Sequence, residues 1–296
     1  MADQTAATLL KGAPLASKIC AEIQRAIDSS AVTPCLVNVV VGDNQASNAY
    51  LGAIDKIAHK VGVRSERRQL PAVADQARIH AAVSEASGDQ SVHGVMIQFP
   101  LPKNIDQHRV VACLSPAKDV DGITDENLGT VLAGKKCHSA PATAAAVVEL
   151  LAAHEQTAPA GKDIVIIGRS LVVGKPLAAM LSASGTDGDA TVTLCHTKTK
   201  DLSEKTRVAD IVIVAAGSHH LLKKDMVKQG AIVIDVGIHA IQDSSGRRLE
   251  GDVNPAVGEV ASALSPVPGG VGPVTNAILM RHVTTVACPG YLSPAW

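Results

Sequence analysis

Apolar residues along this chain recur at two spacings that alternate from one segment to the next. Residues 35–41 and 164–167 form apolar runs of strand length, whereas residues 14–27 and 46–61 place apolar side chains at helical intervals. Further strands are predicted over residues 64–70, 94–98, 190–194, 210–214 and 231–236, and further helices over 77–86, 143–154 and 274–287. This alternation predicts an α/β fold with parallel sheets, because parallel neighbours need a crossover connection.

The 296 residues are enough for two domains, each with its own core. We expect residues 1–142 together with 275–296 to form one α/β domain, and residues 143–274 to form a Rossmann-type, doubly wound parallel sheet. In this division the helix over 143–154 connects the domains and the C-terminal helix returns to the first one. The polar stretch 184–189 is expected to be a surface loop, and residues 242–251 a mobile excursion.

Composition limits the kinds of partner. With 27 basic and 28 acidic residues the net charge is −1, so nothing indicates nucleic acid or a membrane surface, and a small-molecule partner is favoured. The six cysteines form no CxxC pair, which predicts reduced thiols and no zinc site. The N-terminal residues show no secretory or transit pattern and no apolar run approaches about 18 residues, so we expect a cytoplasmic protein.

The segment from Ile164 to Pro176 gives the strongest single indication of a ligand. A β-branched strand runs into Gly168-Arg169-Ser170 and then into a helix with a proline near its start. Gly168 allows a sharp turn, the first amides of the helix attract an anion and Arg169 adds a cation, so we expect a dinucleotide phosphate here. The spacing differs from GxGxxG, and the alternative is a tight turn whose glycines serve packing alone.

The tip of the following strand indicates which dinucleotide is bound. In doubly wound folds a carboxylate at this tip accepts hydrogen bonds from the ribose hydroxyls of NAD. Here residues 195–199 read Cys-His-Thr-Lys-Thr and contain no carboxylate. A hydroxyl such as that of Thr197 beside a cation such as Arg169 suits a 2′-phosphate, which favours NADP. An ordinary polar loop is the alternative interpretation.

Aromatic residues are rare, with two Tyr, one Phe and one Trp, and two of them lie in polar motifs. Tyr50 follows Ala-Ser-Asn-Ala, and Phe99 follows Gln98 in Gln-Phe-Pro-Leu-Pro. Asp121 lies in Lys-Asp-Val-Asp-Gly, in a loop expected at a strand end, where α/β ligand sites form. Alternatives remain: a half-buried core ring for Tyr50, an ordinary strand-end group for Gln98 and a turn residue for Asp121.

A loop rich in glycine and proline precedes the last predicted helix. Residues 265–273 read Ser-Pro-Val-Pro-Gly-Gly-Val-Gly-Pro. Glycines allow close backbone approach while prolines limit flexibility, and a merely structural turn rarely needs both. We therefore expect a preorganised loop that contacts a ligand.

Five segments taken in order resemble the methylenetetrahydrofolate dehydrogenase/cyclohydrolase family over nearly the entire chain. They are residues 41–50, 98–102, 118–122, 168–170 and 266–273. The resemblance implies a folate-binding first domain, an NADP-binding second domain, a cleft between them and a homodimer. It also implies one-carbon chemistry: hydride transfer from methylenetetrahydrofolate to NADP, followed by hydrolysis of the methenyltetrahydrofolate product.

The resemblance further implies the site residues. Tyr50, Gln98 and Asp121 would be catalytic, with Tyr50 stacked on the folate, Gln98 over the reacting ring and Asp121 holding the pterin. A planar ring favours an aromatic platform, and an aminopyrimidine edge offers donors that a carboxylate accepts. The folate site would also include Ile54, Ile97, Phe99, Pro268, Gly269, Gly270, Val271, Gly272 and Pro273. The cofactor site would contain Gly168, Arg169, Ser170, Thr197 and Ile238, and no metal is expected.

One residue departs from the family pattern. The pattern places a lysine four residues after Tyr50, on the same helix face, where this chain has Ile54. Lys56 and Lys60 would point about 120° and about 80° away from Tyr50, so neither replaces it. Oxidation yields a delocalised cation and needs no base, whereas hydrolysis needs proton movement. We therefore expect retained dehydrogenase activity and impaired or absent cyclohydrolase activity.

Two other functions are open at the level of sequence. One is a catalytically silent protein that binds folate and NADP on the same fold. The other is a different Rossmann enzyme, such as a quinate or shikimate dehydrogenase, but its chemistry needs a Lys/Asp pair at a strand end, and the sequence shows none. Absorbance of the methenyl product with NADP or NAD would separate the three.

Overall fold

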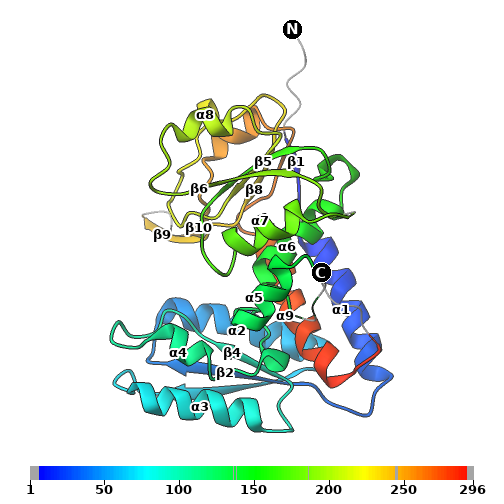
Figure 1. Ribbon diagram of the computed structural model, residues 1–296, viewed down its shortest axis with the longest axis vertical. Coiled ribbons are helices and arrows are strands. Elements are labelled where there is room, and N and C mark those ends of the chain that lie inside the picture. The colour runs from blue at the N-terminus through cyan, green and yellow to red at the C-terminus, as the bar shows by residue number, and fades with distance from the viewer. Residues whose placement is uncertain (1–6, 136, 138, 186, 244–245, 292–296) are drawn as a thin grey trace. The chain divides into compact units, whose positions relative to one another are not determined.

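The computed structural model describes residues 7–135, 137, 139–185, 187–243 and 246–291 (Figure 1). The chain divides into two compact units. Unit 1 holds the described residues up to Leu15 together with Thr143–Thr275, and unit 2 holds Ala16–Ala142 with the described residues from Asn276 onward. In the parts of the chain that the structure describes, no helix combines the length and apolar character needed to cross a bilayer.

The N-terminal segment belongs to a different unit from the one expected. Strand β1 (Thr8–Leu9) pairs in parallel with β11 (Ala263–Leu264), with Thr8 opposite Ala263, and so joins the sheet of unit 1. The prediction assigned these residues to the folate-binding domain. A strand of two residues is too short to show any apolar periodicity in the sequence, so the assignment depends on a backbone pairing that only the fold provides.

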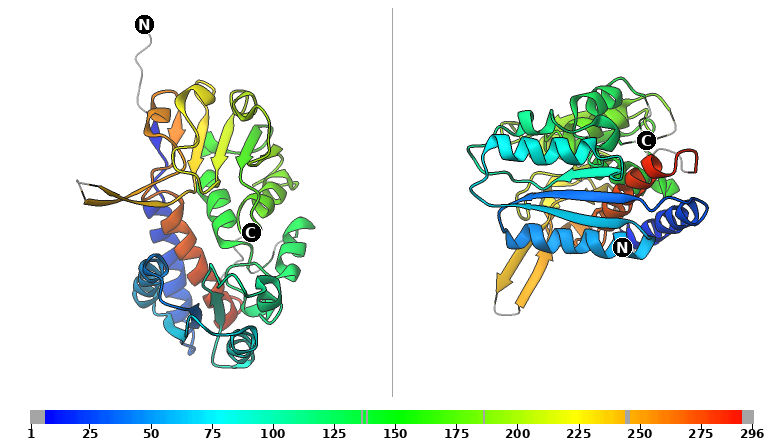
Figure 2. Two further views of the ribbon diagram at one scale, coloured as in Figure 1. Left: turned by 90° about the vertical axis from the view of Figure 1, so that its left-hand side faces the viewer. Right: turned by 90° about the horizontal axis from the view of Figure 1, so that it is seen from below.

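The sheet of unit 2 is a three-stranded parallel sheet in the order β3-β2-β4. Its strands are β2 (Cys35–Val41), β3 (Arg64–Leu70) and β4 (Gly94–Ile97), and α2 (Gln45–Val61) and α3 (Gln76–Gly88) connect them. The two helices cover opposite faces of the sheet (Figure 2, right). β2 is buried over nearly its whole length because it lies between two strands and two helical layers, which explains why all of its residues except Asn38 are apolar.

The core of unit 2 forms where α3 packs on β2 and β4. Ile79 and Val83 of α3 are buried in one cluster with Val37 and Val39 of β2. Asp75 caps α3 by accepting the N–H of Arg78 at 2.9 Å, which satisfies a backbone donor that has no partner in the helix. β3 is the outer strand and carries exposed charges, as edge strands commonly do.

The remaining helices of unit 2 follow β4 or come from the ends of the chain. They are α4 (Gln107–Val111), the short helix at Pro116–Lys118 and α5 (Asp125–Leu132). Three longer helices have residues in both units: α1 (Ala13–Asp28), α6 (Ala142–Ala152) and α9 (Val271–Ala287). Within unit 2, His282 of α9 lies with its Nδ1 2.7 Å from the carbonyl oxygen of Val120, which fastens the segment before Asp121 to this helix.

Unit 1 contains a six-stranded sheet in the order β1-β11-β8-β7-β5-β6, and all of its pairings are parallel. Its longer strands are β5 (Asp163–Ile167), β6 (Thr191–Cys195), β7 (Ile211–Val214) and β8 (Ile232–Asp235), and the helices α7 (Gly174–Ser182) and α8 (Leu202–Thr206) follow β5 and β6. Short 3-10 helices lie at Glu155–Thr157, Lys224–Met226 and Pro255–Glu259. The two-domain α/β fold and the parallel sheet predicted from the sequence are confirmed.

Two segments differ from the sequence prediction. Residues predicted as a mobile excursion include an antiparallel hairpin of β9 (His239–Asp243) and β10 (Gly246–Glu250), which projects from the sheet of unit 1 (Figure 2, left). Helix α9 begins at Val271, three residues before its predicted start at 274. Pro273 is compatible with this start because the first N–H groups of a helix have no partner within it.

Candidate active site

The turn after β5 is built around two glycines of unit 1. Gly168 has a φ of +132°, and a Cβ on it would lie 2.1 Å from the carbonyl oxygen of Ala215, which follows β7. Gly174 opens α7, and a Cβ there would lie 1.9 Å from the carbonyl oxygen of Gly168. Since β5 lies between β6 and β7, the turn stands where the strand order reverses, the usual ligand site of doubly wound sheets. Close backbone packing requires glycine at both positions, whether or not the turn binds a ligand.

Arg169, Ser170 and Thr197 lie at two adjacent strand ends. The N–H of Gly168 donates to the carbonyl oxygen of Cys195 at 2.9 Å, so the turn after β5 and the tip of β6 are neighbours. The hydroxyl of Ser170 accepts a backbone N–H three residues later at 3.1 Å, which fixes the turn. The side chains of Arg169 and Thr197 are exposed. Both side chains are therefore accessible to a ligand at this end of the sheet.

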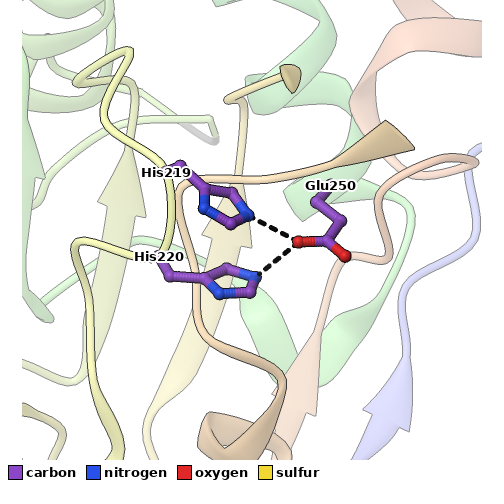
Figure 3. A group of neighbouring side chains, drawn as sticks. All are labelled: His219, His220 and Glu250. Carbon is purple, nitrogen blue, oxygen red and sulfur yellow. Dashed lines mark hydrogen bonds and ion pairs between the residues drawn. The ribbon is translucent and has the colours of Figure 1, made fainter. Parts of the chain in front are cut away.

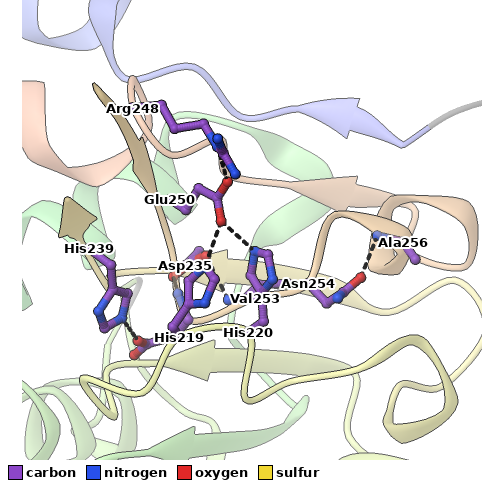
Figure 4. Close-up of polar contacts among 10 residues, drawn as sticks. His219, His220, Asp235, His239, Arg248, Glu250, Val253, Asn254 and Ala256 are labelled. Carbon is purple, nitrogen blue, oxygen red and sulfur yellow. Dashed lines mark hydrogen bonds and ion pairs between the residues drawn. The ribbon is translucent and has the colours of Figure 1, made fainter. Parts of the chain in front are cut away.

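Two buried carboxylates hold the backbone beyond β8 and β10 (Figure 4). Asp235, the last residue of β8, accepts the N–H groups of Gly237 and Asp252 on Oδ1, each at 3.0 Å. It accepts the N–H of Val253 on Oδ2 at 2.9 Å. Burial raises the pKa of Asp235 to about 6, although the three backbone donors act in the opposite direction. This carboxyl joins the end of β8 to the segment after β10.

Asp252 extends the same network to the loop after β7. Its Oδ2 accepts the N–H groups of Ala216 and Gly217 at 2.7 and 2.9 Å, and its Oδ1 lies 2.7 Å from Nε2 of His239. The Asp252 side chain is fully buried, and both of its carboxylate oxygens have hydrogen-bond partners. Sequence analysis missed both aspartates. The one available signal was a carboxylate that directly follows a buried strand, Asp235 after residues 232–234.

The glycine- and proline-rich loop is anchored within unit 1. The N–H of Gly12 donates to the carbonyl oxygen of Gly269 at 2.8 Å, and a Cβ on Gly12 would lie 2.0 Å from the carbonyl oxygen of Gly270. The hydroxyl of Ser265 accepts the N–H of Asp235 at 2.7 Å and donates to the carbonyl oxygen of the same residue at 3.3 Å. Hydrogen bonds thus fix the first residue and the middle of the loop, as a preorganised binding loop requires.

Asp121 is the most perturbed acid of unit 2. Burial raises its pKa to about 7, and the negative charge of Asp119 adds to the effect. The next residue, Gly122, has a φ of +67°, and a Cβ there would lie 2.5 Å from backbone atoms of residues 139–141. Only glycine fits at this position, because any side chain would collide with that backbone. A carboxyl that titrates near neutral pH can either donate or accept a hydrogen bond, and a ligand that presents N–H donors would favour its ionised form.

Tyr50 and Ile54 lie one helical turn apart on α2 but differ in exposure. Tyr50 is 36% exposed, and desolvation followed by the charge of Asp121 raises the pKa of its phenol, which therefore stays protonated. Ile54 has no exposed surface, and Lys56 is exposed. On this helix Ile54 and Val61 are therefore buried, whereas Tyr50 is partly exposed.

Gln98 offers an acceptor that no described residue uses. Its Nε2 donates to the carbonyl oxygen of Phe99 at 2.8 Å, whereas its Oε1 is buried without a hydrogen-bond partner. An unsatisfied buried acceptor is costly unless a ligand or water completes it, so this atom marks a binding position. Ile97 is buried in the core of unit 2 and Phe99 packs against the same core, so both support the strand end that presents Gln98.

The predicted site residues fall into separate sets. Unit 2 contains Tyr50, Ile54, Ile97, Gln98, Phe99 and Asp121, of which Tyr50 and Asp121 are close enough for one to influence the pKa of the other. Unit 1 contains the predicted cofactor residues and the loop from Pro268 to Pro273. Of the cofactor residues, Ile238 follows β8 and is 61% exposed. Within the loop, Gly270 and Val271 are buried, whereas Pro268 is exposed.

Comparisons with known proteins give a consistent result. The family model for the tetrahydrofolate dehydrogenase/cyclohydrolase catalytic domain matches residues 10–121, and the model for the NAD(P)-binding domain of that family matches residues 141–289. The bifunctional protein FolD of Syntrophobacter fumaroxidans is 42% identical over 291 residues, which cover 96% of this chain and 97% of that protein. A FolD protein of Thermus thermophilus is 42% identical over 282 residues, 95% of this chain and 96% of that protein.

Solved structures agree with the sequence comparisons. The bifunctional FolD enzyme of Campylobacter jejuni superposes with a TM-score of 0.88 at 41% identity and covers 95% of this chain and 99% of its own. The Trypanosoma brucei enzyme, solved with NADP and an inhibitor, gives a TM-score of 0.88 at 32% identity over 95% of this chain and 97% of its own. These matches over nearly the full length, with both domain models, show that the chain belongs to the tetrahydrofolate dehydrogenase/cyclohydrolase family.

Proposed function

We propose that the protein is an NADP-dependent methylenetetrahydrofolate dehydrogenase of one-carbon metabolism with weak or absent methenyltetrahydrofolate cyclohydrolase activity. Its relatives are named or titled as bifunctional FolD and as methylenetetrahydrofolate dehydrogenase/cyclohydrolase enzymes. The division between the two activities depends on one observation. Ile54 stands, fully buried, where the family pattern has a lysine.

The dehydrogenase step needs positioning more than proton transfer. The methylene carbon between two nitrogens of the folate gives a hydride to the nicotinamide ring, and the resulting cation is delocalised over both nitrogens, so no base is required. Catalysis then depends on holding two rings in contact. The partly exposed Tyr50 ring supports a stacking role, and the Asp121 carboxyl and the free Oε1 of Gln98 support polar contacts with the pterin.

The cyclohydrolase step makes a different demand. Water adds to the methenyl carbon, one C–N bond breaks and a proton leaves, which calls for a group that can accept and return protons. An amine at position 54 would serve, because burial lowers the pKa of a lysine toward neutral pH. The hydrocarbon side chain of Ile54 has no such group. General acid/base groups typically contribute about 10²- to 10⁴-fold, so we expect a loss of this size in the hydrolysis rate.

The choice of NADP is supported by the charge pattern at the β6 tip. Arg169 and Thr197 are exposed at adjacent strand ends, and residues 195–199 include no carboxylate that would repel a 2′-phosphate. The packed turn at Gly168 suits close approach of a pyrophosphate to the backbone. The Trypanosoma brucei relative was solved with NADP, which agrees with this choice.

A two-cofactor assay tests the dehydrogenase. The full-length protein is mixed with methylenetetrahydrofolate and either NADP or NAD, and absorbance of the methenyl product is followed. We expect turnover with NADP and slower turnover with NAD. Absence of product with both cofactors, combined with calorimetric binding of folate and NADP, would instead identify the catalytically silent binding protein. Absence of both turnover and binding would reject folate chemistry altogether.

Ile54→Lys tests the division of activities, with Ile54→Met as its matched control. Both substitutions introduce an unbranched, flexible side chain at a fully buried position, but only lysine adds an amine. We expect Ile54→Lys to raise the rate of methenyl hydrolysis by about 10²-fold or more, in line with a restored acid/base group, and Ile54→Met to leave it low. Fast hydrolysis by the unmodified protein, which lysine does not improve, would contradict the assigned roles.

The assembly and location of the protein are also part of the proposal. A homodimer is implied by the family resemblance, and analytical ultracentrifugation at micromolar concentration should give twice the chain mass. A cytoplasmic location is supported by six cysteines that form no disulfide with one another. Fractionation of the source cells should place the protein with other cytoplasmic enzymes.

A further inference from the structure

Two histidines and a glutamate of unit 1 converge at one point outside the proposed active-site residues (Figure 3). Nε2 of His219 lies 2.5 Å from Oε2 of Glu250, and Nε2 of His220 lies 3.3 Å from the same oxygen. The two imidazole rings are stacked, with centroids 3.8 Å apart and planes 23° from parallel. Both Nε2 atoms therefore face the same carboxylate from one side, and all three candidate ligand atoms lie within 4.8 Å of one another.

We propose that His219, His220 and Glu250 bind a single divalent transition-metal ion, for which zinc is the best match. Two imidazole nitrogens and one carboxylate oxygen form the ligand set of known zinc sites that keep an open fourth position. With bonds of 2.0–2.2 Å, tetrahedral ligand atoms lie about 3.3–3.6 Å apart. The 3.3 Å between His220 Nε2 and Glu250 Oε2 already meets this spacing. The His219 contact would have to lengthen by about 1 Å, and the ring of this residue is exposed, so it has room to rotate.

Backbone pairing holds the three ligands in register. The N–H of His220 donates to the carbonyl oxygen of Gly251 at 3.3 Å, next to Glu250 at the end of β10. Leu222 continues the pairing through a parallel bridge to Val253. Asp235 accepts the N–H groups of Asp252 and Val253 at 3.0 and 2.9 Å, and these hydrogen bonds hold the segment after Glu250 at the end of β8. The ligands thus lie on a fixed frame, as metal sites require.

Neighbouring side chains orient the ligands. Nε of Arg248 donates to Oε1 of Glu250, which leaves Oε2 directed at the histidines (Figure 4). The ring of His239 packs edge-on against His219 with centroids 5.5 Å apart, while its own Nε2 faces Asp252. Such surrounding hydrogen bonds typically fix the geometry of metal ligands.

The backbone and the exposure of the cluster also suit a metal. His220 has a φ of +51°, a conformation that residues other than glycine rarely adopt and that tends to occur at functional sites. The side chains of His219 and His220 are 38% and 27% exposed, which leaves an entry path for an ion. The sequence prediction of no zinc site considered cysteine spacing only, whereas this site combines a histidine pair with a glutamate from a distant hairpin.

Metal titration of the full-length protein tests the proposal. The protein carries Cys113→Ser, because that half-buried thiol could bind metal by itself, and is freed of metal with a chelator that is then removed. Co²⁺ is the probe, because its visible absorption is intense in four- and five-coordinate protein sites. We expect one Co²⁺ per chain and loss of the signal when Zn²⁺ is added.

Single variants identify the ligands. We expect His219→Ala, His220→Ala and Glu250→Gln each to weaken Co²⁺ binding at least about tenfold. His108→Ala, which removes an exposed histidine of α4, should leave binding unchanged. Zn²⁺ should raise the thermal midpoint of the parent protein but not that of the three ligand variants. The proposal is overturned if the parent shows no saturable Co²⁺ spectrum, or if His219→Ala, at an exposed position, binds Co²⁺ as tightly as the parent.

Discussion

Gly168→Ala should destabilise unit 1 by more than the conformational cost of placing alanine at a positive φ, because the added Cβ also overlaps a neighbouring strand. The added Cβ would lie 2.1 Å from the carbonyl oxygen of Ala215 and 2.8 Å from its carbon. Ordinary contact begins near 3.4 Å, so β5 and β7 would have to separate by about 1.3 Å at this end. The N–H of Ala215 donates to the carbonyl oxygen of Ile167 at 2.8 Å, and this bond opposes the separation.

Two terms set the size of the effect. A non-glycine residue at a φ of +132° costs on the order of 1–3 kcal/mol. Forcing an extra methyl group into a packed position typically costs a further 1–3 kcal/mol, roughly. We therefore expect a loss of about 2–6 kcal/mol in the free energy of unfolding, which is a large part of the total stability of a typical domain.

Urea unfolding followed by circular dichroism measures this loss, with Gly161→Ala as the matched control. Gly161 has a φ of +72°, but a Cβ there would meet nothing within 4 Å, so its substitution costs only the conformational term, about 1–2 kcal/mol. The difference between the two variants isolates the contact with Ala215. Equal midpoints for Gly168→Ala and Gly161→Ala would refute the argument that close approach of β5 and β7 requires glycine.

Three further changes test other parts of the site. Asp121 has a folded-state pKa of about 7, above its ordinary value, so its ionisation destabilises the fold as pH rises from 4 to 7. Asp121→Asn should therefore raise the free energy of unfolding at pH 8, by up to about 4 kcal/mol for a rise in the pKa from 3.8 to about 7, and leave it nearly unchanged at pH 4; equal gains at both pH values would contradict this cause. Arg169→Ala should raise KM for NADP about 10- to 100-fold, the size of a lost charge-assisted hydrogen bond, with KM for NAD unaffected, and steady-state kinetics with both cofactors will check it. Ser265→Ala leaves the buried N–H of Asp235 without its acceptor and should lower the urea midpoint by the equivalent of about 1–3 kcal/mol, whereas Ser262→Ala, at an exposed position, should change it little.

Strands β2, β5, β7 and β8 could be predicted closely because their burial leaves a mostly apolar run. Residues 35–41 are an example, since the strand and the run coincide. The shortest strands and the hairpin of unit 1 were missed. β1 and β11 have two residues each, and the strands β9 and β10 are mostly polar. The start of α9 at Val271 was hidden because its first turn contains Gly272 and Pro273, which usually indicate a loop.

The candidate site divides in the same way. Linear motifs located Gly168, Gln98 and Asp121, because their chemistry depends on neighbours in the chain. The Asp235–Asp252 network could not be found from a linear motif, because its hydrogen bonds join backbone amides from three separate loops. The pair His219-His220 is visible in the sequence, but its partner Glu250 is brought near only by the hairpin. Contacts between segments far apart in the chain have no fixed sequence separation, so they cannot be recognised in a single sequence.

The edge pairing of Thr8 with Ala263 has a consequence for how the protein is made on the ribosome. The first strand of the sheet to be synthesised can pair only after the last one has been made, so this edge forms late and depends on contacts of very high sequence separation. Until this pairing forms, the apolar side chain of Leu10, which is buried in the finished protein, remains exposed and can contact other nascent chains. Slowed synthesis near the C-terminus should therefore favour aggregation, and chaperones that hold N-terminal segments should relieve it.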